Sequence, residues 1–335
     1  MPPSGGAPTL VTGATGFVGS AVARVLAARG HRLRLLVRAG GDRRNIEGLN
    51  AELAEGNLTD AASLARAVAG CRFVVHVAAD YRLFVPDPAA MRAVNVAGTQ
   101  ALLMAAQAAG VARIVYCSSV AALGLTKDGT PADETTPVTE TALIGAYKKS
   151  KHAAEQAVLT LVRERGVPAV IVNPSAPVGP RDIRPTPTGR IILDAARGRM
   201  PAYVETGLNV VHVDDAAEGH ALALERGRVG ERYILGGEDL SLRALLGIIA
   251  EVAGGRGPLL RLSPGALWPV AVAFEALARV GVEPLVTREL LAMSRKRMFY
   301  SSAKARAELG YAARPARQAV VDAVAWFREA GMLAR

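Results

Sequence analysis

The feature that most constrains the fold is a turn with three glycines, Thr12–Gly19, between a short apolar run and a segment of helical periodicity. The apolar run covers residues 9–11, and the helical segment covers residues 20–29 and ends at Gly30. Backbone N–H groups at the start of such a helix point at an anion, and glycines let that anion approach the backbone closely. The spacing is GxxGxxG rather than the commoner GxGxxG. This pattern predicts the phosphate-binding turn of a nucleotide fold.

The residue that would meet the adenosine ribose stands about 20 residues past the last glycine of such a turn. Here Arg38 follows the apolar run 34–37, with Arg43 and Arg44 close behind and no acidic residue at the strand end. An acidic residue would bind the ribose hydroxyls, whereas an arginine pairs with a 2′-phosphate. The sequence therefore favours NADP(H) over NAD(H). The alternative is a solvated surface arginine in an arginine-rich chain.

A tyrosine and a lysine, Tyr147 and Lys151, share one face of a predicted helix because they are four residues apart. A free tyrosine titrates near pH 10, so the lysine ammonium is expected to favour the phenolate. A shift of three pKa units needs about 4 kcal/mol. Ser118 and Ser119, at the end of an apolar strand, offer a hydroxyl for the substrate oxygen. A surface helix pair is the alternative, and the other two motifs argue against it.

Three further stretches, residues 76–83, 185–190 and 211–215, complete a resemblance that runs from about Thr9 to Leu333. The chain resembles an extended short-chain dehydrogenase/reductase of the NAD-dependent epimerase/dehydratase family, the branch that includes dihydroflavonol reductases. It is most similar to the hopanoid-associated sugar epimerase group. The resemblance implies hydride transfer at a secondary alcohol or ketone.

The resemblance also implies which residues form the site. In the family the catalytic hydroxyl stands five residues before a glycine, which selects Ser119 over Ser118 because Gly124 follows. The expected catalytic residues are Ser119, Tyr147 and Lys151. Substrate contacts are expected from Asp80, Tyr81 and Ser119. The expected cofactor contacts are Gly13, Thr15, Gly16, Phe17, Val18, Arg38, Asn57, Leu58, Ala78, Ala79, Tyr147, Lys151 and Pro174.

The chain departs from the family pattern at Asn57, where the family usually has an aspartate that binds the adenine amino group. The Asn57 amide oxygen could accept the same bond, or the residue could shape a turn or cap a helix. His76 is expected to be a satisfied core histidine, and Asn95 to cross-link backbone near the site. Lys148 and Lys149 lie off the face of Tyr147 and Lys151, so both are expected to face solvent.

Strand-like and helical runs alternate through the first half of the chain, which indicates an α/β fold. We expect a Rossmann-type doubly wound parallel sheet with a smaller C-terminal substrate domain. The dinucleotide-binding domain would cover residues 8–175, with 205–236 returning to it; residues 210–215 and 233–235 are expected to rejoin the main sheet. The substrate domain would cover residues 176–204 and 237–335. The expected strands are 8–12, 32–38, 51–55, 72–77, 113–118 and 168–173, and the expected helices are 16–29, 60–69, 88–109 and 145–165.

Composition excludes several classes of function. The net charge is +10, but the 34 arginines are spread along the chain and aromatics make up only 4%, so nucleic-acid binding is not expected. The five histidines show no metal-ligand spacing, so no metal is expected. No apolar run is long enough to span a bilayer, which leaves at most peripheral membrane contact. The start of the chain does not read as a signal peptide, and the only cysteines, Cys71 and Cys117, indicate buried thiols in a reducing cytoplasm.

The sequence therefore predicts an NADP(H)-dependent oxidoreductase acting on a sugar, a hopanoid-linked compound or an apolar carbonyl compound. One alternative is a nucleotide-sugar epimerase that retains its cofactor. Another is a non-catalytic protein that senses the dinucleotide. The resemblance implies a homodimer through helices near 88–109 and 145–165. The apolar segment 266–278 is expected to be a core helix or, alternatively, an apolar wall for a lipid-like substrate.

Overall fold

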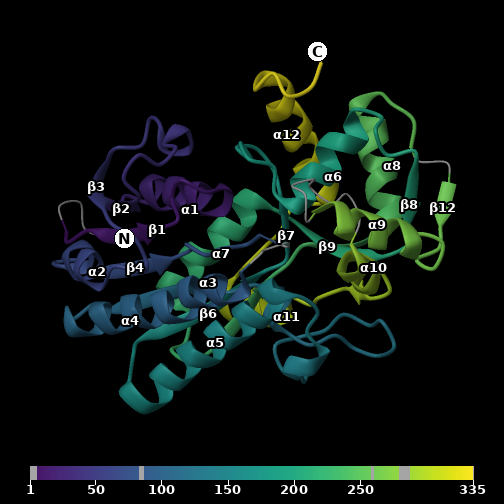
Figure 1. Cartoon of the computed structure of the whole chain (residues 1–335). Coiled ribbons are helices and arrows are strands. Elements are labelled where there is room, and N and C mark those ends of the chain that lie inside the picture. Colours follow the sequence, from purple (N-terminus) through teal and green to yellow (C-terminus); the bar gives the residue numbers. More distant parts are fainter. Residues whose placement is uncertain (1–5, 83–86, 258–259, 279–286, 335) are drawn as a thin grey trace.

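The computed structural model describes residues 6–82, 87–257, 260–278 and 287–334. Its centre is a seven-stranded sheet in the order β10-β6-β5-β4-β1-β2-β3, in which every neighbouring pair is parallel (Figure 1). The predicted Rossmann-type α/β fold is thus confirmed. The strands are β1 (Thr9–Thr12), β2 (Leu33–Val37), β3 (Ala51–Glu55), β4 (Phe73–His76), β5 (Arg113–Cys117), β6 (Ala169–Pro174) and β10 (Arg232–Leu235).

Two apolar clusters cover the two faces of this sheet, and the alternation of side chains along each strand divides them. In β1, Leu10 joins one cluster and Val11 the other. The Val11 face packs on α1 (Phe17–Ala28) and α7 (Val213–Arg226), which also pack on each other. The Leu10 face packs on α2 (Ala61–Val68), α4 (Thr99–Ala108) and α5 (Ala146–Arg165). Because both faces are covered, the inner strands β1, β4, β5 and β6 are largely apolar along their length.

The helix predicted over 88–109 is present but is not uniform. It begins as α3 (Pro88–Arg92), capped by the Asp87 carboxylate, and continues through a π-helical segment, Ala93–Gly98, into α4. A π-helical turn widens the helix and is often found at functional sites. In this chain it contains Asn95, which reaches the candidate site.

A second, smaller sheet is built around β9 (Gly207–His212), which pairs with three strands and with none of the main sheet. The expectation that residues 210–215 rejoin the main sheet is therefore wrong for the strand, and only α7 packs on the main sheet there. Residues 233–235 do join the main sheet, as part of β10. β9 instead pairs with strands that lie outside the main sheet. Its partners are β7 (Ala176–Val178), β11 (Glu238–Ser241) and β13 (Arg297–Met298).

A third apolar cluster holds the C-terminal part together and joins it to β9. Most of its buried residues come from three helices, α6 (Pro187–Ala196), α8 (Leu242–Ala253) and α12 (Ala316–Glu329). Figure 1 shows these helices grouped at the end of the molecule opposite β3. The remaining elements are β8 (Ala202–Val204), β12 (Leu260–Leu262), α9 (Trp268–Ala278), α10 (Arg288–Ser294) and α11 (Ala303–Leu309).

The expectation of a core helix over 266–278 is wrong. α9 forms there, but within 268–277 Ala271 is the one fully buried residue, and Trp268, Val270, Val272 and Leu277 are exposed. Apolar composition alone could not distinguish a helix inside the core from one lying on it.

Candidate functional site

The predicted site segments all follow strands of the main sheet at their carboxyl ends. Because all the strands run in one direction, these ends lie along one edge of the sheet, where ligands of open α/β sheets bind. β1 leads into the glycine turn, β2 into Arg38, β3 into Asn57, β4 into Ala78, β5 into Ser119, and β6 ends at Pro174. The fold therefore places these segments along a single edge.

The glycine turn packs so closely that side chains are excluded. Gly13 has a φ of 73°, and a Cβ on it would lie 2.7 Å from the Ala78 nitrogen. A Cβ on Gly19 would lie 2.0 Å from the Gly13 carbonyl oxygen. The first turn of α1 begins at Gly16, which provides no side-chain cap. N–H groups of Phe17 and Val18 are thus left for an anion, so this turn fits a pyrophosphate.

Arg38 is exposed at the end of β2, and its side chain makes no hydrogen bond or ion pair with any described residue. Its basic neighbours are engaged: Arg43 pairs with Glu55 at 3.1 Å, and Arg44 with Asp42 at 2.7 Å. The loop that carries them is held to the glycine turn by the buried Asn45, whose Nδ2 donates to the Thr15 carbonyl at 3.2 Å. Arg38 is the arginine free to meet a phosphate.

Asn57 shapes a turn, as its alternative interpretation predicts. Its Oδ1 accepts hydrogen bonds from the Thr59 nitrogen and hydroxyl, both at 2.6 Å. Leu58 beside it is buried against Gly98. The amide oxygen that was considered for the adenine amino group is thereby occupied in this local turn.

Lys151 is buried on the face of α5 that packs on the sheet. Its Nζ donates to the Cys117 carbonyl at 2.7 Å and lies 4.9 Å from the centre of the Tyr116 ring. Burial lowers the pKa of the Lys151 ammonium, while the Cys117 thiol and the Glu155 carboxylate raise it. The ammonium is therefore held in place by the end of β5.

Tyr147 lies beside Ser119, one turn of helix before Lys151. Burial raises the pKa of Tyr147 to about 12, and a hydrogen bond with the Ser119 side chain opposes this shift. In this structure desolvation outweighs the other contributions, so the pKa of the phenol lies above its ordinary value and not below it as expected. At neutral pH the phenol is protonated.

The two serines are distinguished by a buried carboxylate. Ser118 turns into the core and donates to Glu155 at 2.5 Å, whereas the Ser119 Oγ accepts from the Ala121 nitrogen at 3.1 Å. Asn173 Nδ2 donates both to Glu155 at 2.7 Å and to the Ser119 carbonyl at 3.0 Å. Arg232 also pairs with Glu155, with 3.3 Å between its Nη1 and the Oε1 of the carboxylate. The network fixes the backbone of Ser119 and leaves its hydroxyl facing Tyr147.

Asn95 cross-links backbone near the site, as predicted. Its Oδ1 accepts from the Asp80 nitrogen at 2.7 Å, and its Nδ2 donates to the Asp80 carbonyl at 2.8 Å and to the Ser150 hydroxyl at 3.0 Å. The loop after β4 is thus tied to α5. The Asp80 carboxylate itself pairs with Arg82 at 2.5 Å.

Tyr81, the other expected substrate contact, is 47% exposed. Burial of its hydroxyl raises its pKa, with Asp182 adding to the shift and Arg184 opposing it. Asp182 and Arg184, in the segment before α6, are thus charged neighbours of this hydroxyl.

His76 is a core histidine, as predicted. It is fully buried between the Thr12 and Thr99 hydroxyls, at 2.7 and 2.9 Å, and burial lowers its pKa to about 3. The prediction for Lys148 is wrong: its side chain is half-buried, and its Nζ lies 3.8 Å from the Met298 sulfur. β13 covers this side of α5, which sequence periodicity alone could not indicate. Lys149 is exposed, as predicted.

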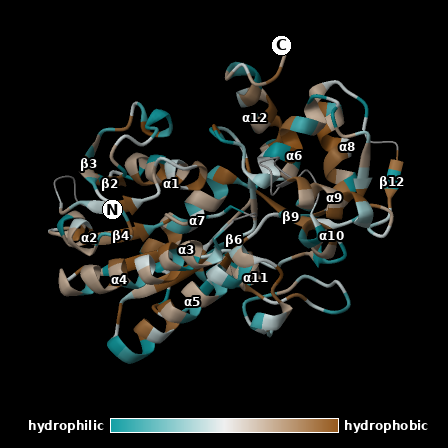
Figure 2. Ribbon diagram, viewed as in Figure 1, coloured by the Kyte–Doolittle hydropathy of each residue, from teal (hydrophilic) through white to brown (hydrophobic). Residues whose placement is uncertain are grey.

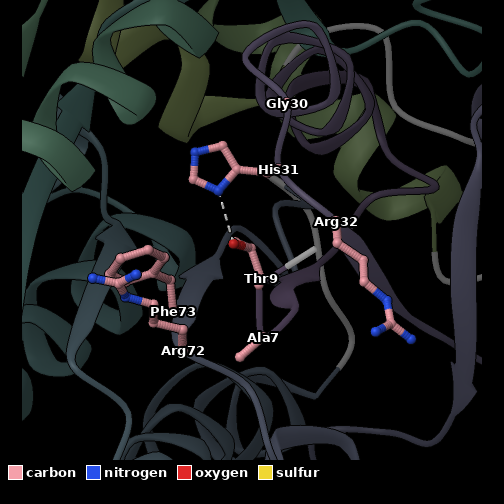
Figure 3. Close-up of a pocket in the computed structure, with 8 residues that line it drawn as sticks. Ala7, Thr9, Gly30, His31, Arg32, Arg72 and Phe73 are labelled. Atoms are coloured by element: carbon pink, nitrogen blue, oxygen red, sulfur yellow. Dashed lines mark hydrogen bonds between the residues drawn. The ribbon is translucent and has the colours of Figure 1, made fainter. Parts of the chain in front are cut away.

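A separate small pocket lies at the other edge of the main sheet, among the amino ends of β1, β2 and β4 (Figure 3). His31 Nδ1 and the Thr9 hydroxyl are hydrogen-bonded there at 2.9 Å. None of the expected site residues lines it. We therefore place the candidate site at the carboxyl edge.

The family model for the NAD dependent epimerase/dehydratase family matches residues 9–236, which include the glycine turn, the Tyr147–Lys151 pair and the whole main sheet. The chain belongs to the NAD dependent epimerase/dehydratase family.

Relatives in the family span nearly the whole chain. A Synechocystis sp. protein with the provisional name dihydroflavonol 4-reductase is 44% identical, over 96% of this chain and 94% of that protein. Sterol demethylase protein B of Methylococcus capsulatus is 35% identical, over 97% and 99%. The crystal structure of gox2253 is 65% identical and superposes with a TM-score of 0.89 over 97% of this chain and 99% of that one. The chain therefore belongs to a family of enzymes that includes oxidoreductases and epimerases.

Sequence reasoning missed Glu155 and Asn45 as supports of the site. Glu155 could have been found, because it lies four residues after Lys151 and so on the same helix face. Asn45 carried no such signal. Among the described residues, no cluster of histidine, cysteine and carboxylate side chains could hold a metal ion. No described helix is both long and apolar enough to cross a bilayer.

Proposed function

We propose that this family member is an NADP(H)-dependent oxidoreductase that transfers hydride at a ketone or secondary alcohol. The observation that carries the proposal is the placement of Ser119, Tyr147 and Lys151 at the carboxyl edge of the sheet that also carries the glycine turn. The bound nicotinamide would supply or accept the hydride at its C4 atom. Residues Gly13, Thr15, Gly16, Phe17 and Val18 would hold the pyrophosphate, and Ala78, Ala79, Leu58 and Pro174 would line the rest of the dinucleotide site.

In the reduction direction, Tyr147 would donate its phenolic proton to the ketone oxygen as the carbonyl carbon gains hydride. The phenol carries its proton at neutral pH, as a proton donor must. Ser119 would hold the same oxygen by a hydrogen bond. Lys151, anchored on the Cys117 carbonyl, would bind the nicotinamide ribose and lower the cost of the phenolate that forms.

The preference for NADP(H) rests on Arg38. Its guanidinium is exposed and pairs with no described residue, while Arg43 and Arg44 are both paired with carboxylates. A free guanidinium at the end of β2 suits a 2′-phosphate, which it can bind in bidentate geometry.

For the substrate we propose an apolar carbonyl compound, ahead of a sugar or a hopanoid-linked compound. Two relatives with near-complete overlap bear names that refer to sterols and dihydroflavonols, which are polycyclic. Tyr81 and Asp80 of the loop after β4, together with Ser119, would contact it.

The experiment is NADPH oxidation by the purified chain with a panel of apolar ketones and sugar nucleotides. Replacing Tyr147 with Phe should reduce kcat at least about a hundredfold, because the general acid is lost while the ring remains. The melting temperature of Tyr147→Phe should stay within a few degrees of the wild type. Turnover close to the wild-type rate would refute the assigned role.

A nucleotide-sugar epimerase that retains its cofactor is the alternative, and the family description includes that activity. Such an enzyme would interconvert a sugar nucleotide with no net change in NADPH absorbance. A non-catalytic dinucleotide sensor is a further alternative from another class. It would bind NADPH with no turnover on any substrate, and the presence of both Tyr147 and Lys151 argues against it.

We further propose a cytoplasmic homodimer that forms through α4 and α5. Two buried free thiols, Cys71 and Cys117, support a reducing compartment. The exposed Met104 of α4 supports a helix face available to a second copy. Light scattering of the purified chain would measure the assembly directly.

A further inference from the structure

α9 presents most of its apolar residues to solvent, while its only charged residue, Glu275, is paired with Arg288. Trp268, Val270, Val272 and Leu277 are 52%, 42%, 38% and 47% exposed. The Glu275 carboxylate, by contrast, accepts hydrogen bonds from the Arg288 nitrogen at 2.8 Å and from its Nε at 2.7 Å. A surface helix of a globular protein normally has the reverse arrangement.

The exposed arc is continuous. With about 100° between successive residues of a helix, Trp268 and Val272 lie at one side of the arc and Val270 and Leu277 at the other. The positions between them are Pro269, Ala273 and Ala276, all exposed and uncharged. About half of the circumference of α9 is therefore apolar and faces solvent. Figure 2 shows α9 in the brown of hydrophobic residues.

The neighbouring helix α10 extends this apolar surface. Leu290 of α10, which packs on α9, is 37% exposed. We call Trp268, Val270, Val272, Leu277 and Leu290 the α9 patch. Contiguous exposed apolar surface of this kind marks an interaction site.

The chain around the α9 patch is strongly basic. Residues 256–257, 260–278 and 287–299 contain six basic side chains and two acidic ones. Both acidic residues have partners within the chain: Glu275 pairs with Arg288, and Glu289 lies against Gly145 at the start of α5. The six basic residues are Arg256, Arg261, Arg288, Arg295, Lys296 and Arg297.

We propose that the α9 patch docks on the surface of a bilayer that contains anionic lipids, with α9 lying in the plane of the interface. Valine and leucine side chains would enter the acyl boundary, Trp268 would lie at the headgroup level, and the flanking arginines would meet lipid phosphates. α9 has 11 residues, which suits a helix that lies on a membrane rather than one that crosses it. This proposal does not depend on the proposed activity.

Charge favours a membrane over a second copy of the chain. A two-fold contact would place the same patch on both sides of the interface and so bring like-charged arginines together. An anionic lipid surface instead complements them.

The test uses the full chain and two kinds of vesicle. One contains phosphatidylcholine alone, and the other contains about one-third phosphatidylglycerol, which makes its surface strongly anionic. We expect at least tenfold tighter partitioning to the anionic vesicles, weakening as salt is added, and a blue shift of tryptophan fluorescence that Trp268→Phe removes. Val270→Glu/Val272→Glu should abolish partitioning. Val229→Glu is the matched control, since Val229 is 48% exposed between α7 and β10, away from the patch.

Three outcomes would overturn the proposal. They are absence of partitioning to either vesicle, equal partitioning of the double variant and the wild type, and a vesicle-free dimer that the double variant abolishes. The last result would assign the patch to a second copy. Trp268→Ser provides an independent variant if the double variant does not fold.

Discussion

At the scale of single residues, the candidate site depends on how buried polar groups are paired. Glu155 is fully buried and binds Ser118, Asn173 and Arg232 at once. These bonds replace the water that a carboxylate loses on burial, and they orient the backbone that presents Ser119.

Replacing Glu155 with Ala should lower the free energy of unfolding by about 3 kcal/mol or more, because the buried Ser118 and Asn173 and the half-buried Arg232 lose their acceptor. Urea denaturation would measure the change. Glu164→Ala on the same helix is the control: Glu164 and its partner Arg163 are both exposed, so a change below about 1 kcal/mol is expected. Equal effects of the two substitutions would contradict the role of the network.

The proposed preference for NADP(H) also depends on a single residue, Arg38. Replacing Arg38 with Ala should reduce the ratio of kcat/KM for NADPH to that for NADH at least about tenfold, since a charge-assisted hydrogen bond to phosphate contributes about 1.5–3 kcal/mol. Arg43→Ala should change the ratio less, because Arg43 already pairs with Glu55. An unchanged ratio in Arg38→Ala would argue against the NADP(H) preference.

At the scale of elements, the glycine turn shows how a helix start is pressed against a strand. Gly19 lies in the first turn of α1, directly against the Gly13 carbonyl, and Gly13 lies directly against Ala78. A side chain at either position would push α1 away from the carboxyl edge of the sheet. The close packing of α1, β1 and the loop after β4 thus depends on two missing methyl groups.

Gly19→Ala should therefore lower the melting temperature and weaken NADPH binding together, because its Cβ would lie 2.0 Å from backbone that cannot yield. Gly247→Ala is a matched control within helix α8, where no heavy atom lies within 4 Å of an added Cβ. It should raise stability by up to about 1 kcal/mol. Thermal melts and cofactor titrations of both variants would separate packing from helix propensity.

At the scale of the whole molecule, buried histidines link the stability of the fold to pH. His76 and His220 are fully buried, and burial lowers their pKa values to about 3 and about 4. In the unfolded chain both return to their ordinary pKa near 6.5, so the unfolded state binds more protons below that pH. Their contribution to stability is fully present above pH 6.5 and is lost as pH falls towards 3.

The free energy of unfolding should consequently decrease between pH 6.5 and pH 4, by up to about 1.4 kcal/mol per histidine and pH unit. Denaturant titrations at several pH values would measure the slope. His76→Gln should reduce the slope over this range, whatever its effect on stability at neutral pH. A slope equal to that of the wild type would show that His76 is not the titrating group.

The local patterns of the sequence determined the main sheet and the helix that carries Tyr147 and Lys151. The glycine turn, the apolar strand runs and the spacing of Tyr147 and Lys151 are set by neighbouring residues, and backbone sterics and helical periodicity act over that same short range. Parallel strands then bring their carboxyl ends to one edge, which is why widely separated motifs could be assigned to one site.

Only the tertiary structure decided features that depend on distant neighbours. The partners of β9, the shielding of Lys148 by β13 and the exposure of α9 all depend on which elements pack together. The pKa of Tyr147 belongs to the same class: Lys151, four residues away, suggested a lower value, whereas burial within the fold raises it. Desolvation is set by everything that surrounds a group, and a linear pattern of residues does not contain that information.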